Sequence, residues 1–277
     1  MAVFLSAAQA QALSSPVWLD CRFRLDDPAA GRRLYETAHV PGAIYAHLDE
    51  DLADLSAGPG RHPLPNPAAF HARLDHWGVS GRPRIVYDDV SGAMAARAWW
   101  LARWAGHREV YILNGGYAAW QAAGFEVSAA SNPPTPAAGS WTSDQLPQAQ
   151  EAQVRRGLAN GAAAVVDARA SARFLGHVEP IDPVAGHIPG AQNVPFEANL
   201  DSSGYLRPTS ELRSLWRDAM REFAPTDVIH MCGSGVTACF NLAVLEHLEL
   251  CGSRLFVASW SGWIADPNNP VEAEDAG

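Results

Sequence analysis

Residues 228–245 read VIHMCGSGVTACFNLAVL. A short run of apolar, mostly branched residues ends at Cys232, and two glycines and a serine follow it. From residue 236 to residue 250 the apolar residues then recur with the spacing that is typical of a helix. The segment therefore predicts a buried strand, a tight loop and a helix in that order, with a thiol at the first position of the loop.

The motifs around this segment occur twice in the chain of 277 residues. Each half contains, in the same order, a D-x-R motif, an H-[VI]-P-G-A motif, a strand–loop–helix pattern and an aromatic motif. The matched pairs are Asp20 and Asp167, Arg22 and Arg169, His39 and His187, and Trp120 and Trp263. A repeat of this kind predicts two copies of one domain.

The stretch AASNPPTPAAGSW at residues 129–141 lies between the two copies and is rich in proline, alanine and small polar residues. Such a composition is typical of a linker. We therefore predict a first domain over residues 1–128, a linker over 129–143 and a second domain over 144–277.

Short apolar segments alternate with helical ones in both copies. Residues 162–169 (AAAVVDAR) and 226–231 (TDVIHM) are typical of buried parallel strands, and residues 209–220 have helical spacing. This alternation predicts an α/β fold in which each domain is a mainly parallel sheet with helices on both faces. In such sheets functional loops follow the carboxyl ends of the strands, where Cys232 lies.

The composition excludes several classes of partner. The net charge of −10 argues against nucleic acid and against an anionic membrane surface. No apolar run reaches the length of a membrane span. Residues 1–16 lack the basic residues of a signal peptide, so a helix running up to Pro16 is expected there. Four cysteines without disulfide-like spacing favour a cytoplasmic location.

The loop after the strand would change the chemistry of Cys232. A thiolate attacks sulfur far better than a thiol does, and the amide groups at a helix N-terminus favour the anion. Gly233 and Gly235 allow the backbone to curl so that successive amides can bind an anion, and Ser234 and Thr237 add hydroxyl groups. The loop is therefore predicted to activate a sulfur nucleophile.

A buried core residue is the alternative interpretation of Cys232, although a core residue would not require the G-S-G-V-T that follows it. Cys239 and Cys251 have no such loop and are expected in the core. His230 lies on the same strand face as Cys232, but no further ligand has useful spacing, so neither a metal nor another cofactor is predicted.

Taken together, the repeated motifs and the cysteine loop of the second copy resemble the tandem rhodanese-type sulfurtransferases. The loop CGSGVTA at residues 232–238 resembles the 3-mercaptopyruvate sulfurtransferase branch, whereas thiosulfate-using relatives of the animal type have basic residues where this chain has Gly233 and Ser234. Aligning residues 87–96 with 230–239 sets Asp89 opposite Cys232, which predicts a catalytically silent first domain. The family pattern gives that domain the role of shaping the walls of a cleft.

The resemblance implies that Cys232 takes a sulfur atom from 3-mercaptopyruvate and passes it, as a persulfide, to a thiol acceptor such as a thioredoxin-like protein, or to cyanide. It implies that Arg173 binds the substrate together with the loop residues Gly233, Gly235, Val236 and Thr237. Relatives that use mercaptopyruvate have a second arginine where this chain has Ile181 or Asp182, so thiosulfate stays open as the donor.

The same branch uses a histidine and an aspartate from the first domain, beside the loop serine, as a proton relay. The matching residues are Ser234, His62 and Asp49, with Asp51 as the alternative to Asp49. The near-neutral pKa of a histidine suits such proton exchange. His39, His187 and Arg169 recur in both copies, which favours a structural role for them.

Two further functions remain as alternatives. A phosphatase of this fold would need an arginine where the chain has Ala238. A tandem domain that only binds a sulfur-carrying partner would need no intact cysteine loop. Nothing in the sequence requires more than a monomer.

Overall fold

The computed structural model describes residues 2–142 and 145–274. The chain forms two compact units, of which the first comprises Met1–Asp54, Leu64–Gln145 and Ser202–Leu206 and the second comprises Leu55–Pro63, Leu146–Asp201 and Arg207–Gly277. Residues 55–63 therefore belong to the second unit, although they lie inside the first sequence repeat. Asn132, Gly139 and Trp141 of the predicted linker bond to His39 and Asp75 of the first unit.

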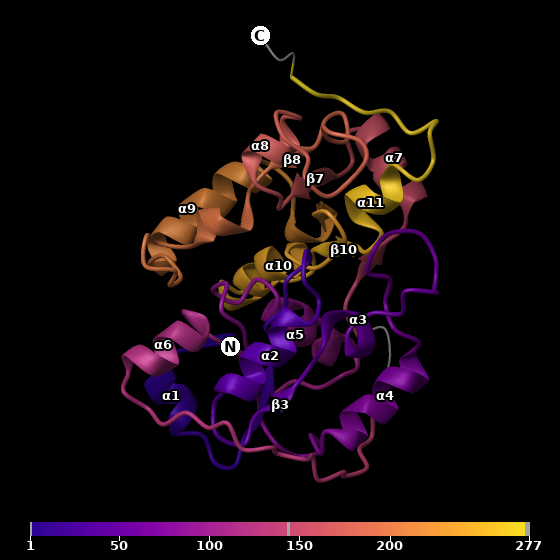
Figure 1. Cartoon of the computed structure of the whole chain (residues 1–277). Helices are drawn as coiled ribbons and strands as arrows, with labels where there is room; N and C mark the ends of the chain where they lie inside the picture. Colours follow the sequence, from indigo (N-terminus) through magenta and orange to yellow (C-terminus); the bar gives the residue numbers. More distant parts are fainter. Residues whose placement is uncertain (1, 143–144, 275–277) are drawn as a thin grey trace. The chain divides into compact units, whose positions relative to one another are not determined.

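The first unit contains a sheet of five parallel strands in the order β1-β5-β4-β2-β3, flanked by helices (Figure 1). Its elements are β1 (Phe4–Leu5), α1 (Ala7–Gln11), β2 (Val17–Asp20), α2 (Ala30–Thr37), β3 (Ile44–Tyr45), α3 (Leu48–Asp51), α4 (Pro67–His76), β4 (Arg84–Tyr87), α5 (Ala95–Trp104), β5 (Val110–Leu113) and α6 (Gly116–Ala122).

The second unit contains a sheet of the same form, with five parallel strands in the order β6-β10-β9-β7-β8. Its elements are β6 (Gln148–Ala149), α7 (Glu151–Ala159), β7 (Ala164–Asp167), α8 (Ser171–Phe174), β8 (Gln192–Asn193), the 3₁₀ turn η1 (Phe196–Asn199), α9 (Thr209–Met220), η2 (Pro225–Asp227), β9 (Val228–Met231), α10 (Ala238–His247), β10 (Arg254–Phe256) and α11 (Ser259–Trp263). The predicted α/β fold with two parallel sheets is confirmed.

Central strand β9 has helices on both of its faces. Ile229 and Met231 lie in one core cluster with Val154 of α7 and Trp263 of α11. Side chains alternate along a strand, so His230 points to the opposite face, where its ring contacts Trp216 of α9 with 5.5 Å between ring centroids. Burial on both faces explains why the strand is apolar without the alternation of a half-exposed strand.

The N-terminal segment differs from its prediction. Instead of one helix up to Pro16, Phe4–Leu5 form edge strand β1 beside β5, and α1 begins only at Ala7. Ser6 ends the strand and caps the helix, because its side chain accepts from the amide of Gln9 while the Gln9 side chain accepts from the amide of Ser6. Within the described residues no helix combines the length and the apolar character that a bilayer crossing requires.

Candidate active site

Cys232 directly follows β9 and is buried, with 2% of its surface exposed. Its amide donates to Oγ of Ser259 (3.1 Å), and its carbonyl oxygen accepts from the amide of Trp260 (3.0 Å). The carbonyl oxygen of Gly233 accepts from the amide of Ser261 (2.9 Å). The start of α11 therefore fixes both polar groups of Cys232 and the first turn of the loop.

The remainder of the loop needs glycine at position 235. Gly235 has a φ of 74°, and a Cβ there would lie 2.5 Å from the carbonyl oxygen of Val257. Among the described residues, no acceptor is bonded to the amides of five loop positions, Gly233, Ser234, Val236, Thr237 and Ala238. Buried amides are nearly always bonded, so this group of donors is suited to an anion at the N-terminus of α10.

The first unit shows which residue takes the place of Cys232. In the sheets, Tyr87 pairs with Asp20 as Met231 pairs with Asp167, so Asp88 is the residue that follows the strand. The carbonyl oxygen of Asp88 accepts from the amide of Tyr117 (2.7 Å), as that of Cys232 accepts from Trp260. The prediction that Asp89 stands opposite Cys232 is therefore wrong by one position, because the loop of the first unit is one residue longer before its helix begins.

The Asp88 carboxylate fills the loop of the first unit. It accepts hydrogen bonds of 2.6 to 2.8 Å from four backbone amides, those of Val90, Gly92, Met94 and Ala95. Burial raises the pKa of the Asp88 carboxyl, and these four donors oppose the rise. Asp89 instead forms an ion pair with Arg24 (2.7 Å). The loop of the first unit therefore binds an anion, the Asp88 carboxylate, whereas the loop of the second unit has Cys232 in place of this carboxylate.

His62 and Ser234 come together in the second unit. Nδ1 of His62 and Oγ of Ser234 share a hydrogen bond of 2.7 Å across 172 positions of sequence, and both side chains are buried. Segment 55–63 brings His62 to the cysteine loop. A histidine bonded to a loop hydroxyl can hold and transfer a proton there.

The two candidate aspartates lie on α3 of the first unit. Asp49 is half-buried, and desolvation raises the pKa of its carboxyl. Asp51 accepts from the amide of His47 (2.8 Å) and pairs with Arg73 (3.0 Å), contacts that stabilise α3 and join it to α4. A part for either aspartate in the relay stays a prediction.

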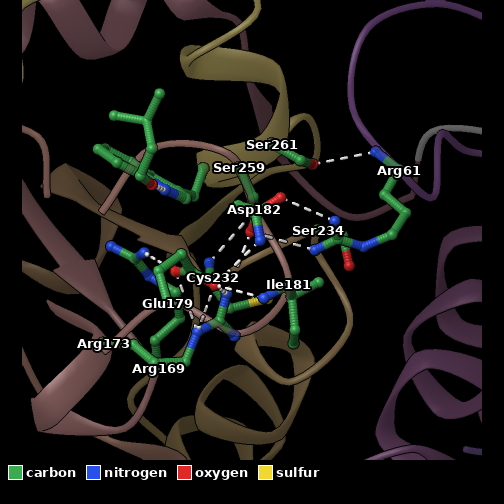
Figure 2. A network of polar contacts seen from close by, with 12 residues as sticks. Arg61, Arg169, Arg173, Glu179, Ile181, Asp182, Cys232, Ser234, Ser259 and Ser261 are labelled. Carbon is green, nitrogen blue, oxygen red and sulfur yellow. Dashed lines mark hydrogen bonds and ion pairs between the residues drawn. The ribbon is translucent and has the colours of Figure 1, made fainter. Parts of the chain in front are cut away.

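Arg173 is held by carboxylates at the end of α8 (Figure 2). Its Nε and Nη2 donate to Glu179 at 2.7 to 3.1 Å, and Nη2 also donates to Asp182 (3.1 Å). Nη1 makes no hydrogen bond within the described part of the chain and would lie 3.6 Å from a Cβ on Gly233. The predicted substrate arginine therefore lies beside the cysteine loop with one nitrogen unbonded.

Arg169 has the structural role that its repetition suggested. It pairs with Asp167 (2.7 Å) and donates to the carbonyl oxygen of Gly186 (2.8 Å), the residue before His187. In the first unit Arg22 pairs with Asp20 and donates to Ala38, the residue before His39.

The two repeated histidines are equally alike. Nδ1 of His39 bonds to the carbonyl oxygen of Tyr35 (2.6 Å), and Nδ1 of His187 bonds to that of Phe174 (2.8 Å). Each imidazole also stacks on the ring of the residue whose carbonyl it contacts. These contacts fix the H-[VI]-P-G turns in both units, whether or not a cysteine follows the central strand.

The remaining cysteines and His230 have simpler surroundings. Cys239 is buried as expected, whereas the expected core position of Cys251 is wrong, because this residue lies beyond the end of α10 and is exposed. His230 is fully buried, and burial lowers the pKa of its imidazole to about 3. In residues 2–142 and 145–274 no three His, Cys, Asp or Glu side chains are grouped as metal ligands.

Several residues of the site were not foreseen from the sequence, namely Arg61, Glu179, Asp182 and Ser259. Figure 2 shows the Arg61 side chain reaching from its loop toward Asp182. The sequence contained an indication of Arg61, which directly precedes the candidate His62. In addition, an acid, Asp182, occupies the region in which a second arginine was expected, so an arginine for the site had to come from another part of the chain.

Comparison with known proteins agrees with this geometry. The model of the rhodanese-like domain matches residues 6–123 and again residues 150–266. A Pseudomonas aeruginosa protein named "Probable 3-mercaptopyruvate sulfurtransferase" is 44% identical over 99% of both chains. The thiosulfate sulfurtransferase of Rattus norvegicus is 32% identical over 94% of this chain and 89% of its own.

Solved structures give the same result. The 3-mercaptopyruvate sulfurtransferase from Leishmania major superposes with a TM-score of 0.85 at 31% identity, covering 95% of this chain and 74% of that one. Both sequence and structure therefore match over nearly the whole chain.

Proposed function

The chain belongs to the rhodanese family, and on that premise we propose that it is a sulfurtransferase that carries sulfur on Cys232. One observation supports this proposal above the others. The loop after Cys232 contains a group of buried amides without acceptors in the described residues, while the matching loop of the first unit binds the Asp88 carboxylate. A persulfide anion on Cys232 would give the second loop the charge that Asp88 gives the first.

In the first step the Cys232 thiolate attacks the sulfur of 3-mercaptopyruvate. A sulfur–sulfur bond forms and the carbon–sulfur bond breaks, with its electron pair passing to carbon. The products are the Cys232 persulfide and the enolate of pyruvate, which takes up one proton. Amides of Gly233, Ser234 and their neighbours would stabilise the outer sulfur when it is charged.

The proton for the enolate is assigned to Ser234 and His62. Their 2.7 Å hydrogen bond allows a proton to pass from the imidazole to the hydroxyl as the hydroxyl gives its own to carbon. Asp49, or Asp51, is the proposed partner that supports His62. Arg173 is assigned to the substrate carboxylate, which it can reach with its unbonded Nη1.

In the second step a thiolate acceptor attacks the outer sulfur of the persulfide, and Cys232 leaves as a thiolate. We propose a small thiol or a thioredoxin-like protein as acceptor, a monomeric enzyme and a reducing, cytoplasmic compartment. The four cysteines support that compartment, because all of them are free thiols.

The first unit is proposed to be catalytically silent, since a carboxylate at position 88 cannot accept and release sulfur.

The donor is tested by comparing kcat/KM for 3-mercaptopyruvate and thiosulfate on one preparation. We expect the larger value for 3-mercaptopyruvate, because the loop has Gly233 and Ser234 where basic residues would favour a dianion, and because the His62–Ser234 pair can protonate an enolate. A larger value for thiosulfate would assign the same cysteine to a thiosulfate sulfurtransferase. No transfer from either donor would reject the proposed function.

A further inference from the structure

Two guanidinium groups lie over the first glycine of the cysteine loop. A Cβ added to Gly233 would lie 3.4 Å from Nη2 of Arg61 and 3.6 Å from Nη1 of Arg173. Both arginines and the loop belong to the second unit. Because position 233 has no side chain, two cations approach the backbone one residue beyond Cys232.

Arg61 is fixed at two points. Its amide donates to Oγ of Ser261 (3.0 Å), on the same helix α11 that holds Cys232. Its guanidinium donates to both carboxylate oxygens of Asp182, from Nη1 (2.7 Å) and from Nη2 (3.3 Å). This two-point geometry restricts the side chain far more than a single contact with a surface charge would.

The ion pairs around the loop balance one another. Three arginines face three carboxylates, and the contacts between them connect Arg61, Arg169 and Arg173 with Asp167, Glu179 and Asp182. Three guanidinium nitrogens have no hydrogen-bond acceptor within the described residues: Nε of Arg61 and Nη1 of Arg169, which are buried, and Nη1 of Arg173. Nη1 of Arg169 lies 3.5 Å from Glu179, so the donors left for an anionic ligand are those of Arg61 and Arg173.

Asp182 stands at or next to the position where a second arginine would be expected after Arg173. In this chain that place holds the acid Asp182, which forms an ion pair with Arg61 of segment 55–63. The positive charge is therefore supplied from position 61, and Asp182 holds it in place. The chain therefore keeps two cations at the loop although one of them has a different origin in the sequence.

We propose that Arg61 is a second donor-binding residue, which together with Arg173 recognises the anionic end of the sulfur donor, the carboxylate of a 2-oxo acid. This inference rests on the proposed sulfurtransferase function and extends it to a residue that sequence motifs do not mark. Asp182 is the positioning residue that directs Arg61 toward the loop.

The test compares Arg61→Gln, Arg61→Lys and Arg217→Gln with the unmodified chain, using 3-mercaptopyruvate as donor and pyruvate as competitive inhibitor. Arg217 is a matched control, because it is an exposed arginine on α9 of the same unit whose side chain is 73% exposed. Arg61→Gln should raise KM and the inhibition constant of pyruvate by about tenfold each, or about 1.4 kcal/mol, with kcat changed less than about threefold. Arg61→Lys should give an intermediate KM, and Arg217→Gln should change nothing.

The failures are distinguishable. If the unmodified chain transfers sulfur from neither donor, the proposed function is rejected. If the unmodified chain is active and Arg61→Gln leaves both constants unchanged, the role of Arg61 alone is rejected. If Arg61→Gln unfolds, the decision passes to Arg61→Lys, for which a KM and an inhibition constant equal to those of the unmodified chain would reject the role.

Discussion

Asp88 and Cys232 hold the same position in the two repeats: each directly follows the central strand, and the carbonyl oxygen of each accepts from the helix amide of Tyr117 or Trp260. The backbone is therefore matched while the side chains differ. In the first unit the side chain itself carries the negative charge that the loop amides bind. In the second unit the proposed source of that charge is a persulfide on Cys232. The first unit therefore shows how the amides of such a loop bind an anion.

The role of Asp88 is tested by stability. Asp88→Ala leaves four backbone amides without their acceptor, two of them in buried contacts, and should lower the free energy of unfolding by about 3 kcal/mol. Asp89→Ala is the control, because its ion pair with the partly exposed Arg24 should contribute less than about 1 kcal/mol. Urea unfolding measures both variants, and an equal loss for the two would contradict the assignment of Asp88 to the amide group.

Gly235 is predicted to be irreplaceable in the loop. Gly235→Ala combines a φ of 74° with a Cβ 2.5 Å from the carbonyl oxygen of Val257, so the loop must move. A displacement of the reacting groups should lower kcat/KM by about 100-fold. Gly233→Ala is the matched substitution, since its Cβ would meet the ends of two side chains, Arg61 at 3.4 Å and Arg173 at 3.6 Å, and no backbone atom, so it should lose less activity. Similar losses in both variants would argue against a rigid loop at residue 235.

The His62–Ser234 pair should matter chiefly when carbon must be protonated. Ser234→Ala is expected to lower kcat with 3-mercaptopyruvate by about 100-fold and to change turnover of thiosulfate much less, because sulfite leaves without a proton. His62→Gln should have a similar effect, and the double variant should lose little more than either single one, since the two act as one unit. Equal slowing with both donors would remove the pair from proton transfer.

Much of this architecture follows from the sequence. The helical spacing of 209–220 predicted α9 with its bounds, whereas the strand predicted at 226–231 begins two residues later, at Val228, as β9. Both elements were found because strands buried on both faces and amphipathic helices have distinct periods. The repeated motifs identified Arg169, His39 and His187 as structural, and the contacts that they share with their counterparts in the other unit agree with that role.

Other features depend on tertiary contacts that no local pattern encodes. Asp88 was missed because the two loops differ by one residue, which the strand pairing reveals and an ungapped alignment hides. Arg61 was missed because its partner Asp182 is 121 residues away. The β1 strand was missed because two apolar residues beside a helix give no periodic signal, and only pairing with β5 defines them.

Burial of His230 predicts a dependence of stability on pH. With a pKa of about 3, the imidazole is neutral in the folded state at pH values where the unfolded chain, with a pKa near 6.5, binds a proton. The folded state is therefore disfavoured progressively as the pH falls from about 6.5 toward 3.

His230→Leu should remove this pH dependence, because leucine binds no proton. It should break no hydrogen bond, since neither ring nitrogen of His230 is bonded within the described residues. Between pH 7 and pH 5 the unmodified chain should lose about 2 kcal/mol more unfolding free energy than the variant. Urea titrations at the two pH values measure the difference, and identical losses would show that His230 is not responsible.

Sulfur carriage by Cys232 is tested most directly by the mass of the intact protein after incubation with 3-mercaptopyruvate and removal of the donor. We expect the chain to gain the mass of one sulfur atom, on the peptide that contains Cys232, and to lose it again when a thiol is added. Cys251→Ser should behave like the unmodified chain, since that thiol is exposed and distant in sequence from the loop, and Cys232→Ser should gain nothing. A gain of sulfur that persists in Cys232→Ser, or no gain from any sulfane or mercaptan donor in the unmodified chain, would contradict the account.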